Sequence, residues 1–175
     1  VLFRSHKNIG NMIKAFAKFK KNFVNEFKFV LVGKDYDKSI TKEIKKIVSD
    51  LGVIDDVVFL GSVAEDYLRS LYKNAFCLLF ASSYEGFGIP ILEAMSFGIP
   101  VITSKMYSMP EVGGKSALYV DPNNIDDIFF NMNKVLDNNL RNDLIRLGLE
   151  RVKQFSWKKS AGIIINFLDK YESNQ

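Results

Sequence analysis

At 175 residues, 47% hydrophobic and 25% charged, the chain is long and apolar enough to bury the core of one globular domain. Its net charge of +4 arises from basic residues mixed with acidic ones along most of the chain, which excludes a strongly basic nucleic-acid-binding stripe. No apolar run approaches the roughly 20 residues of a membrane span, and no signal peptide is apparent, so we expect neither.

Short apolar runs alternate with segments of helical periodicity from end to end. Asn8 is a good N-cap for the first amphipathic segment, and Gly52 is a typical C-terminal stop for the second. The apolar runs between such segments are typical of strands buried on both faces. In chain order, the sequence predicts a strand at 1–3, a helix over 8–19, a strand over 27–33, a helix over 39–52, a strand over 57–61, a helix over 64–75, a strand over 76–80, a helix from Pro90, a strand over 99–104, a loop containing MPEV, a strand over 117–120, helices near 125–137 and 139–154, and a last helix over 157–171.

This order of elements predicts one α/β domain over residues 1–175, with a Rossmann-like, doubly wound parallel sheet. Ligands in this architecture lie beyond the C-terminal ends of the strands, so the loops after residues 3, 32, 60, 80 and 103 should share one rim. We expect the aromatic side chains of the first and last helices to pack in the core, with some of them exposed where an absent domain would cover them. The opening VLFRSHKN has no methionine and is typical of a piece of a longer protein.

The stretch SSYEGFGIPILEA, residues 82–94, carries the strongest chemical signal. Pro90 suits a first helical turn, and Gly86 and Gly88 allow close approach of the backbone, so the free N–H groups there favour a phosphate or diphosphate. The carboxylates of Glu85 and Glu93 flank this site and can accept hydrogen bonds from hydroxyls, which together indicates a nucleotide sugar. Spacing alone equally favours the other interpretation, a solvated loop acid followed by a helix-start acid.

The same region resembles a known family. SSYEGFGIPILEAMSFGIPVITS followed by MPEVGGKSALYVDP is similar to the donor-binding domain of family 4 retaining glycosyltransferases, which are glycosyl transferases group 1 with the GT-B fold. Glu85 and Glu93 match the family's E-x7-E signature, RSHKNI looks like the start of its C-terminal domain, and VVFLGSV looks like its nucleoside loop. The resemblance covers nearly the whole chain and implies the C-terminal half of such an enzyme, without its N-terminal acceptor domain.

The resemblance also implies a role for each matching position. Glu85 would hold hydroxyls of the donor sugar, Glu93 those of the ribose, and the backbone of the glycine turn would bind sugar or phosphate. Cations and helix-terminal N–H groups would stabilise the leaving diphosphate without a metal or other cofactor. The expected catalytic residues are Glu85 and Lys7, and the expected substrate-binding residues are Arg4, Gly61, Ser62, Val63, Gly86, Phe87, Gly88, Ile89 and Glu93.

The predicted function is therefore the donor half of a retaining hexosyltransferase. It would take a hexose, such as mannose, from a nucleoside-diphosphate sugar for transfer to a glycan or lipid-linked acceptor in polysaccharide or lipopolysaccharide biosynthesis. The resemblance implies a cytoplasmic site at the inner membrane face, reached through the missing half, and weak nucleotide binding without transfer by the chain alone. The alternative is a non-catalytic nucleotide-binding or interaction module of the same fold, while an epimerase or phosphorylase fits less well.

Other chemical signals in the sequence are weaker. The run DYD at 35–37 resembles a metal-binding D-x-D motif but arises easily by chance in a polar turn. The run GGKS at 113–116 lacks the glycine that a phosphate loop needs at position 109, where Met109 stands. Cys77 lies in the apolar run FCLLF, as a buried small side chain does, and we expect His6 to pack within a loop. The sequence predicts no metal site.

Overall fold

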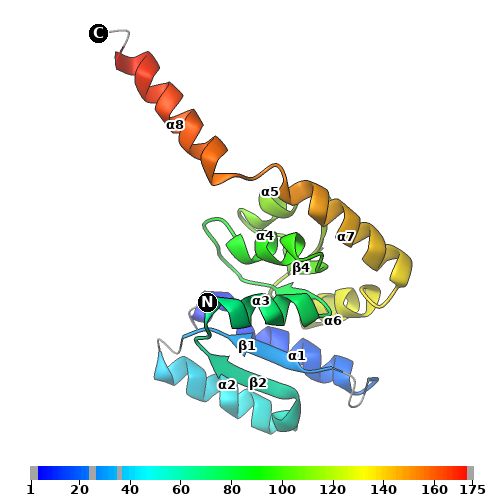
Figure 1. Cartoon of the computed structure of the whole chain (residues 1–175). Helices are drawn as coiled ribbons and strands as arrows, with labels where there is room; N and C mark the ends of the chain where they lie inside the picture. Colours follow the sequence, from blue (N-terminus) through cyan, green and yellow to red (C-terminus); the bar gives the residue numbers. More distant parts are fainter. Residues whose placement is uncertain (1–3, 24–26, 35–36, 173–175) are drawn as a thin grey trace.

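The computed structural model describes residues 4–23, 27–34 and 37–172, in which helices alternate with short strands (Figure 1). The strands are β1 (Phe29–Val32), β2 (Val57–Gly61), β3 (Leu78–Phe80), β4 (Val101–Ser104) and β5 (Ala117–Val120). The helices are α1 (Ile9–Lys20), α2 (Lys38–Asp50), α3 (Glu65–Asn74), α4 (Ile89–Ser96), α5 (Met109–Gly113), α6 (Ile125–Lys134), α7 (Asn138–Val152) and α8 (Trp157–Glu172), with short 3-10 helices η1 (Ser5–Lys7) and η2 (Ile54–Asp56).

All pairs between the described strands are parallel, which confirms the predicted α/β fold class. Phe29 of β1 lies opposite Val57 of β2, while Leu78, Val101 and Ala117 align across β3, β4 and β5. The described strands thus form a two-stranded and a three-stranded sheet, whereas the sequence suggested a single one. The strand predicted at residues 1–3 lies outside the described residues.

Two apolar clusters fill the space between the helices and the strands. In the first, α1 packs against α2 and α6 and contributes the fully buried Ile13. In the second, Ile91 and Met95 of α4 pack with Val101 of β4 and Met109 of α5. This second cluster anchors α4, whose N-terminus follows the glycine turn, and so gives the candidate site a rigid support.

Several boundaries and one element differ from the expectation, and the helix α6 ends at Lys134, three residues earlier than expected. The strands β1, β3 and β4 begin two residues later than expected. Phe27 and Phe76, which were expected to start β1 and β3, lie outside these strands. Their rings contact each other edge-on, with centroids 5.1 Å apart. The segment MPEV is the helix α5 rather than a loop, because Pro110 suits its first turn and Met109 and Val112 are buried.

The aromatic side chains of α1 and α8 differ in burial. Phe16 and Phe19 of α1 lie in the core, as expected. The expectation of core packing is wrong for the last helix, where Trp157 and Phe167 are 86% and 68% exposed. The physical reason is visible in Figure 1, where α8 extends away from the body of the molecule instead of packing on it. Within the described residues, no helix is both long and apolar enough to cross a bilayer.

Candidate functional site

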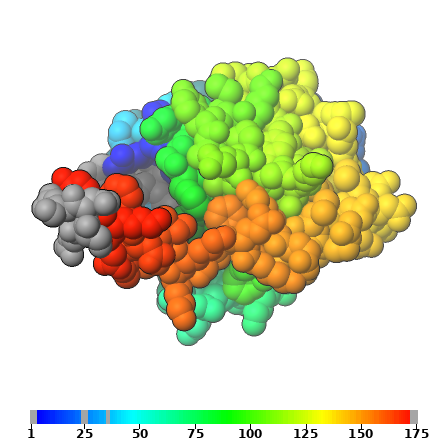
Figure 2. Space-filling model, turned by 90° about the horizontal axis from the view of Figure 1, so that it is seen from above, coloured from blue at the N-terminus to red at the C-terminus, as the bar shows by residue number. Residues whose placement is uncertain are grey.

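The loop after β3 lies against the N-terminal turn η1. Ser83 donates hydrogen bonds from its backbone N–H and its Oγ to the carbonyl of His6, at 2.8 and 3.1 Å. Asn8 follows η1 with a left-handed φ of 55°, which asparagine tolerates, and its side-chain amide donates to the carbonyl of Ala81 at 3.0 Å. Figure 2 shows the outcome from above, with the blue N-terminal residues beside the green segment that follows β3. Two segments far apart in sequence thereby form one site.

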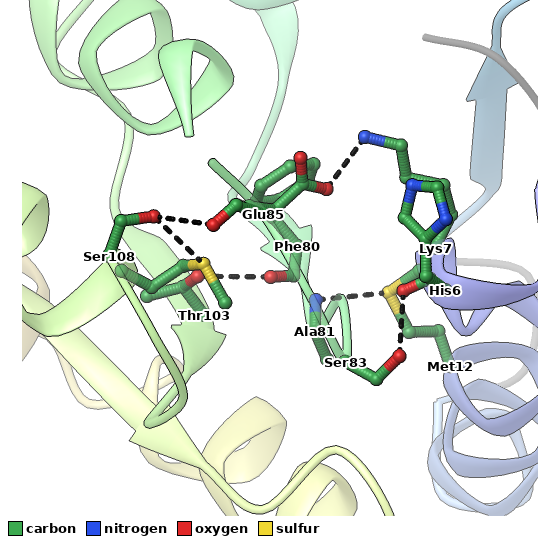
Figure 3. Close-up of polar contacts among 10 residues, drawn as sticks. His6, Lys7, Met12, Phe80, Ala81, Ser83, Glu85, Thr103 and Ser108 are labelled. Carbon is green, nitrogen blue, oxygen red and sulfur yellow. Dashed lines mark hydrogen bonds and ion pairs between the residues drawn. The ribbon is translucent and has the colours of Figure 1, made fainter. Parts of the chain in front are cut away.

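Hydrogen bonds beneath this loop fix the point at which it leaves the sheet. Thr103 Oγ1 donates to the carbonyl of Phe80 at 3.0 Å, and the N–H of Ala81 points at the sulfur of Met12 at 3.4 Å (Figure 3). The next residue, Ser82, is fully buried, and its hydroxyl has no hydrogen-bond partner within the part of the chain that the structure describes. The loop therefore starts from a buried base held by strand and helix together.

Lys7 and Glu85, the two predicted catalytic residues, are in direct contact (Figure 3). Lys7 Nζ lies 2.6 Å from Glu85 Oε1, and the two side chains are only 15% and 13% exposed. The same ammonium group lies 5.5 Å from the centroid of the Phe80 ring. Ser108 donates its hydroxyl to the backbone carbonyl of Glu85 at 3.0 Å, which ties the loop to the start of α5. A cation and an acid therefore stand together in partial shelter from water, where charges interact more strongly than on an open surface.

The glycine turn leads from Glu85 into α4. Gly88 has a φ of 100°, which favours glycine, and a Cβ placed there would lie 3.1 Å from Cδ1 of Ile91. Gly86 borders open space, since a Cβ there would have no atom within 4 Å. Phe87 and Ile89 are 45% and 49% exposed and Gly86 is exposed as well, whereas Gly88 between them is buried. At the N-terminus of α4, Pro90 has no N–H and the N–H of Ile91 donates to the carbonyl of Gly88 at 3.0 Å, so the N–H of Ile89 and the helix dipole are what this end can offer an anion.

Glu93 has a different partner from Glu85. Its Oε2 accepts a hydrogen bond from the hydroxyl of Tyr72 in α3, at 3.0 Å. The ring of Tyr72 stacks on Phe97, with centroids 5.6 Å apart and planes 8° from parallel. Burial, and after it the negative charge of Glu93, raises the pKa of Tyr72 above its ordinary value. The two glutamates of the E-x7-E pattern therefore lie on the same loop-and-helix segment but in separate polar contacts.

The predicted nucleoside loop lies at the end of β2. Gly61 adopts a φ of 64°, and its carbonyl accepts from the N–H of Gly33 at 2.9 Å, so it closes the paired part of β1 and β2. Ser62 is exposed and Val63 is half-buried. These residues are set on the two-stranded sheet, whereas Glu85 follows the three-stranded one, and their roles stay predictions.

Arg4 directly precedes η1, where its backbone carbonyl accepts a hydrogen bond from the N–H of Lys7 at 2.9 Å. It lines a cavity of about 220 Å³ between η1, α1 and α2, together with Lys14 and Glu43, and no other predicted site residue lines this cavity. The implied contact between Arg4 and a diphosphate thus stays a prediction.

Sequence reasoning missed three side chains that shape the site: Asn8 as a bridge, Ser108 as a loop anchor, and Tyr72 as the partner of Glu93. The sequence marks Asn8 only as a helix cap, and Tyr72 only as part of the helix expected over 64–75. Side-chain contacts between elements leave no periodic signal, so the pattern could not identify them.

The weaker sequence signals are explained by local structure. Asp37 is the N-cap of α2, and hydrogen bonds from the side chain and backbone of Ser39 lower its pKa, while Asp35 lies outside the described residues. Burial raises the pKa of the Cys77 thiol to about 11, as befits an inert side chain. Among the described residues, no group of three or more His, Cys, Asp and Glu is placed to hold a metal ion.

Most of the chain is similar in sequence to known proteins. The family model for glycosyl transferases group 1 matches residues 2–151. O-antigen chain mannosyltransferase B of Escherichia coli is 38% identical over 109 residues, which are 62% of this chain and 29% of that protein. O-antigen chain mannosyltransferase RfbU of Salmonella typhimurium is 37% identical over 117 residues, 67% of this chain and 31% of its own length. The chain thus spans less than a third of the length of these relatives.

The fold has a solved counterpart as well. HepE of Anabaena, in complex with UDP and glucose, superposes with a TM-score of 0.84 and 21% sequence identity, over 95% of this chain and 46% of HepE. At that identity, the likeness shows a shared fold.

Proposed function

The chain belongs to the glycosyl transferases group 1 family, and on that basis we propose that it is the donor-binding part of a glycosyltransferase that uses a nucleoside-diphosphate sugar. The observation that carries this proposal is the partly buried contact between Lys7 and Glu85 beside the glycine turn at the start of α4. It offers a cation and helix-terminal N–H groups to a diphosphate and a carboxylate to sugar hydroxyls, within one loop. The O-antigen mannosyltransferases among its relatives support mannose as the sugar and a surface polysaccharide as the product.

The proposed chemistry depends on the charge that develops on the leaving group. As the bond between the sugar and the diphosphate breaks, Lys7 and the N–H groups at the start of α4 stabilise the departing phosphate oxygens. Glu85 positions the sugar through its hydroxyls and does not attack the anomeric carbon. The Oε1 atom of Glu85 is engaged by Lys7, so Oε2 is the oxygen directed to the sugar. The reaction retains the anomeric configuration, as the E-x7-E signature implies, and needs no metal or other cofactor.

The rest of the proposal concerns the longer protein. We assign residues 1–175 to the donor domain and the acceptor site to a second domain of the full-length enzyme. That enzyme would act in the cytoplasm, at the inner face of the membrane, where soluble donors meet lipid-linked acceptors. The chain alone should bind a nucleotide without transferring a sugar. If the full-length protein binds donors but transfers none, the non-catalytic module is the better description.

Calorimetric titration of the chain with UDP, GDP, ADP and dTDP and their hexose derivatives tests donor binding. We expect one nucleotide class to bind with a dissociation constant of millimolar or lower, and the variant Glu85→Gln to weaken binding of the sugar derivative more than that of the bare diphosphate. Glu150→Gln is the matched control, because Glu150 is an exposed acid of α7 paired with Lys153. If no nucleotide binds at millimolar concentration, the proposal is contradicted.

A further inference from the structure

The hydroxyl of Tyr72 joins α3 to the second glutamate of the site. It donates to Oε2 of Glu93 at 3.0 Å, across 21 positions of sequence, and both side chains are partly buried. A carboxylate can accept hydrogen bonds through both of its oxygens. Because the tyrosine engages Oε2, Oε1 is the oxygen of Glu93 best placed to accept from a ligand.

The ring of Tyr72 is held by the same helix that carries Glu93. It stacks on Phe97, which follows α4, at 5.6 Å and 8°. The N–H of Phe97 donates to the carbonyl of Glu93 at 3.3 Å, so ring and carboxylate are supported by one turn of the backbone. The hydroxyl therefore approaches Glu93 from a fixed direction, and rotation of the glutamate away from this direction would break a hydrogen bond to a charged group.

The hydroxyl of Tyr72 also loses its proton less readily than that of an exposed tyrosine, because its pKa is raised. Burial comes first, and the charge of Glu93 second, in raising the pKa of Tyr72 above its ordinary value. A protonated tyrosine hydroxyl is a hydrogen-bond donor, and Oε2 of Glu93 is its acceptor at 3.0 Å. Glu93 is thus held in one orientation.

We propose that Tyr72 is a positioning residue that orients Glu93 to accept hydrogen bonds from the vicinal hydroxyls of the donor ribose. This inference rests on the donor-binding function proposed above. It predicts that the hydroxyl of Tyr72 contributes to affinity only through the two ribose hydroxyls, and not through the base or the phosphates. A hydrogen bond that only stabilised the packing of α3 on α4 would affect all ligands equally.

The test compares two tyrosine variants of the chain. Tyr72→Phe removes the hydroxyl and keeps the ring on Phe97. Tyr119→Phe is the matched control, because the Tyr119 hydroxyl donates to the carbonyl of Gly114 at 2.7 Å and burial raises its pKa to about 12. Calorimetry measures the affinity of each variant for whichever of UDP, GDP and ADP binds most tightly and for its 2′,3′-dideoxy analogue.

We expect Tyr72→Phe to weaken the ribonucleotide about tenfold, the size of one charge-assisted hydrogen bond, and to leave the dideoxy analogue unchanged. Tyr119→Phe should change neither affinity. In a Glu93→Gln background, Tyr72→Phe should have little further effect, because the two side chains act as one unit.

Each contrary result points to a different error. An equal loss for both nucleotides, or no loss for either, overturns the positioning role of Tyr72 and leaves the donor function standing. If the unsubstituted chain binds none of the nucleotides, the donor function fails, and the role of Tyr72 fails with it.

Discussion

The ammonium group of Lys7 pairs with Glu85 in the folded chain and is also part of the candidate site. The side chains of Lys7 and Glu85 are 15% and 13% exposed. The side chains of Lys153 and Glu150, which also form an ion pair, are 66% and 64% exposed. Removing one member of a sheltered pair leaves the other charge without compensation, while an exposed charge is simply hydrated. The two pairs therefore offer a direct comparison.

Lys7→Met should lower the free energy of unfolding by about 1–3 kcal/mol, because it leaves the Glu85 carboxylate unpaired in a half-buried site. Lys153→Met should change it by about 0.5 kcal/mol or less. Urea unfolding of both variants measures the difference. Lys7→Met should also weaken nucleoside diphosphate binding, and equal stability with unchanged binding would show that the contact has neither role.

The glycine turn makes a second prediction at this scale, from two glycines two residues apart. Gly88→Ala should cost about 1–3 kcal/mol, since its left-handed backbone is strained for any residue with a Cβ. Gly86→Ala should cost about 0.5 kcal/mol or less, because it borders open space, yet it should weaken nucleotide binding by narrowing the approach to the backbone. Thermal unfolding and calorimetry separate the two effects. Equal loss of stability in both variants would contradict this account.

At the scale of the elements, the apolar runs and helical periodicity of the sequence predicted every described strand and the long helices. These patterns missed α5, whose five residues are too few to show a helical period. They also extended two strands through Phe27 and Phe76, since an aromatic residue suits a strand and an aromatic cluster alike. The glycines and acids of the candidate site could be predicted from the sequence. The side chains that contact them from other elements could be identified only in the folded chain.

The helix α8 shows the limit of reading burial from composition. Its apolar residues suggested a core position, but they are more than half exposed along most of the helix, as at Trp157, Phe167 and Tyr171. An exposed helix contributes little to the stability of the body from which it extends. The last helix and the core can therefore be separated by experiment.

Removal of residues 156–175 should change the free energy of unfolding by less than about 1 kcal/mol, because little apolar surface of α8 is buried. Leu144→Ala in α7 should cost about 2–5 kcal/mol, because Leu144 is 4% exposed in the core. Chemical unfolding of both variants makes the comparison. A truncation as costly as the leucine substitution would mean that α8 packs on the body in solution.

At the scale of the whole molecule, the α/β architecture places the loop after β3, a strand of the three-stranded sheet, against the N-terminal turn η1. The turn η1 contacts the loop after β3 through His6 and Asn8, and this contact brings Lys7 to Glu85. The chain belongs to the glycosyl transferases group 1 family, and its relatives include proteins named as O-antigen mannosyltransferases. The chain spans less than a third of the length of those relatives. The acceptor and the complete transfer reaction are therefore proposals about a longer protein.

A crystal structure of the chain with its tightest-binding nucleoside diphosphate tests the central claim most directly. We predict that the diphosphate lies within hydrogen-bonding distance of Lys7 Nζ and of the first N–H groups of α4, with the ribose hydroxyls on Glu93. A nucleotide seated instead in the cavity lined by Lys14 and Glu43, without contact to Lys7 or Glu93, would contradict it.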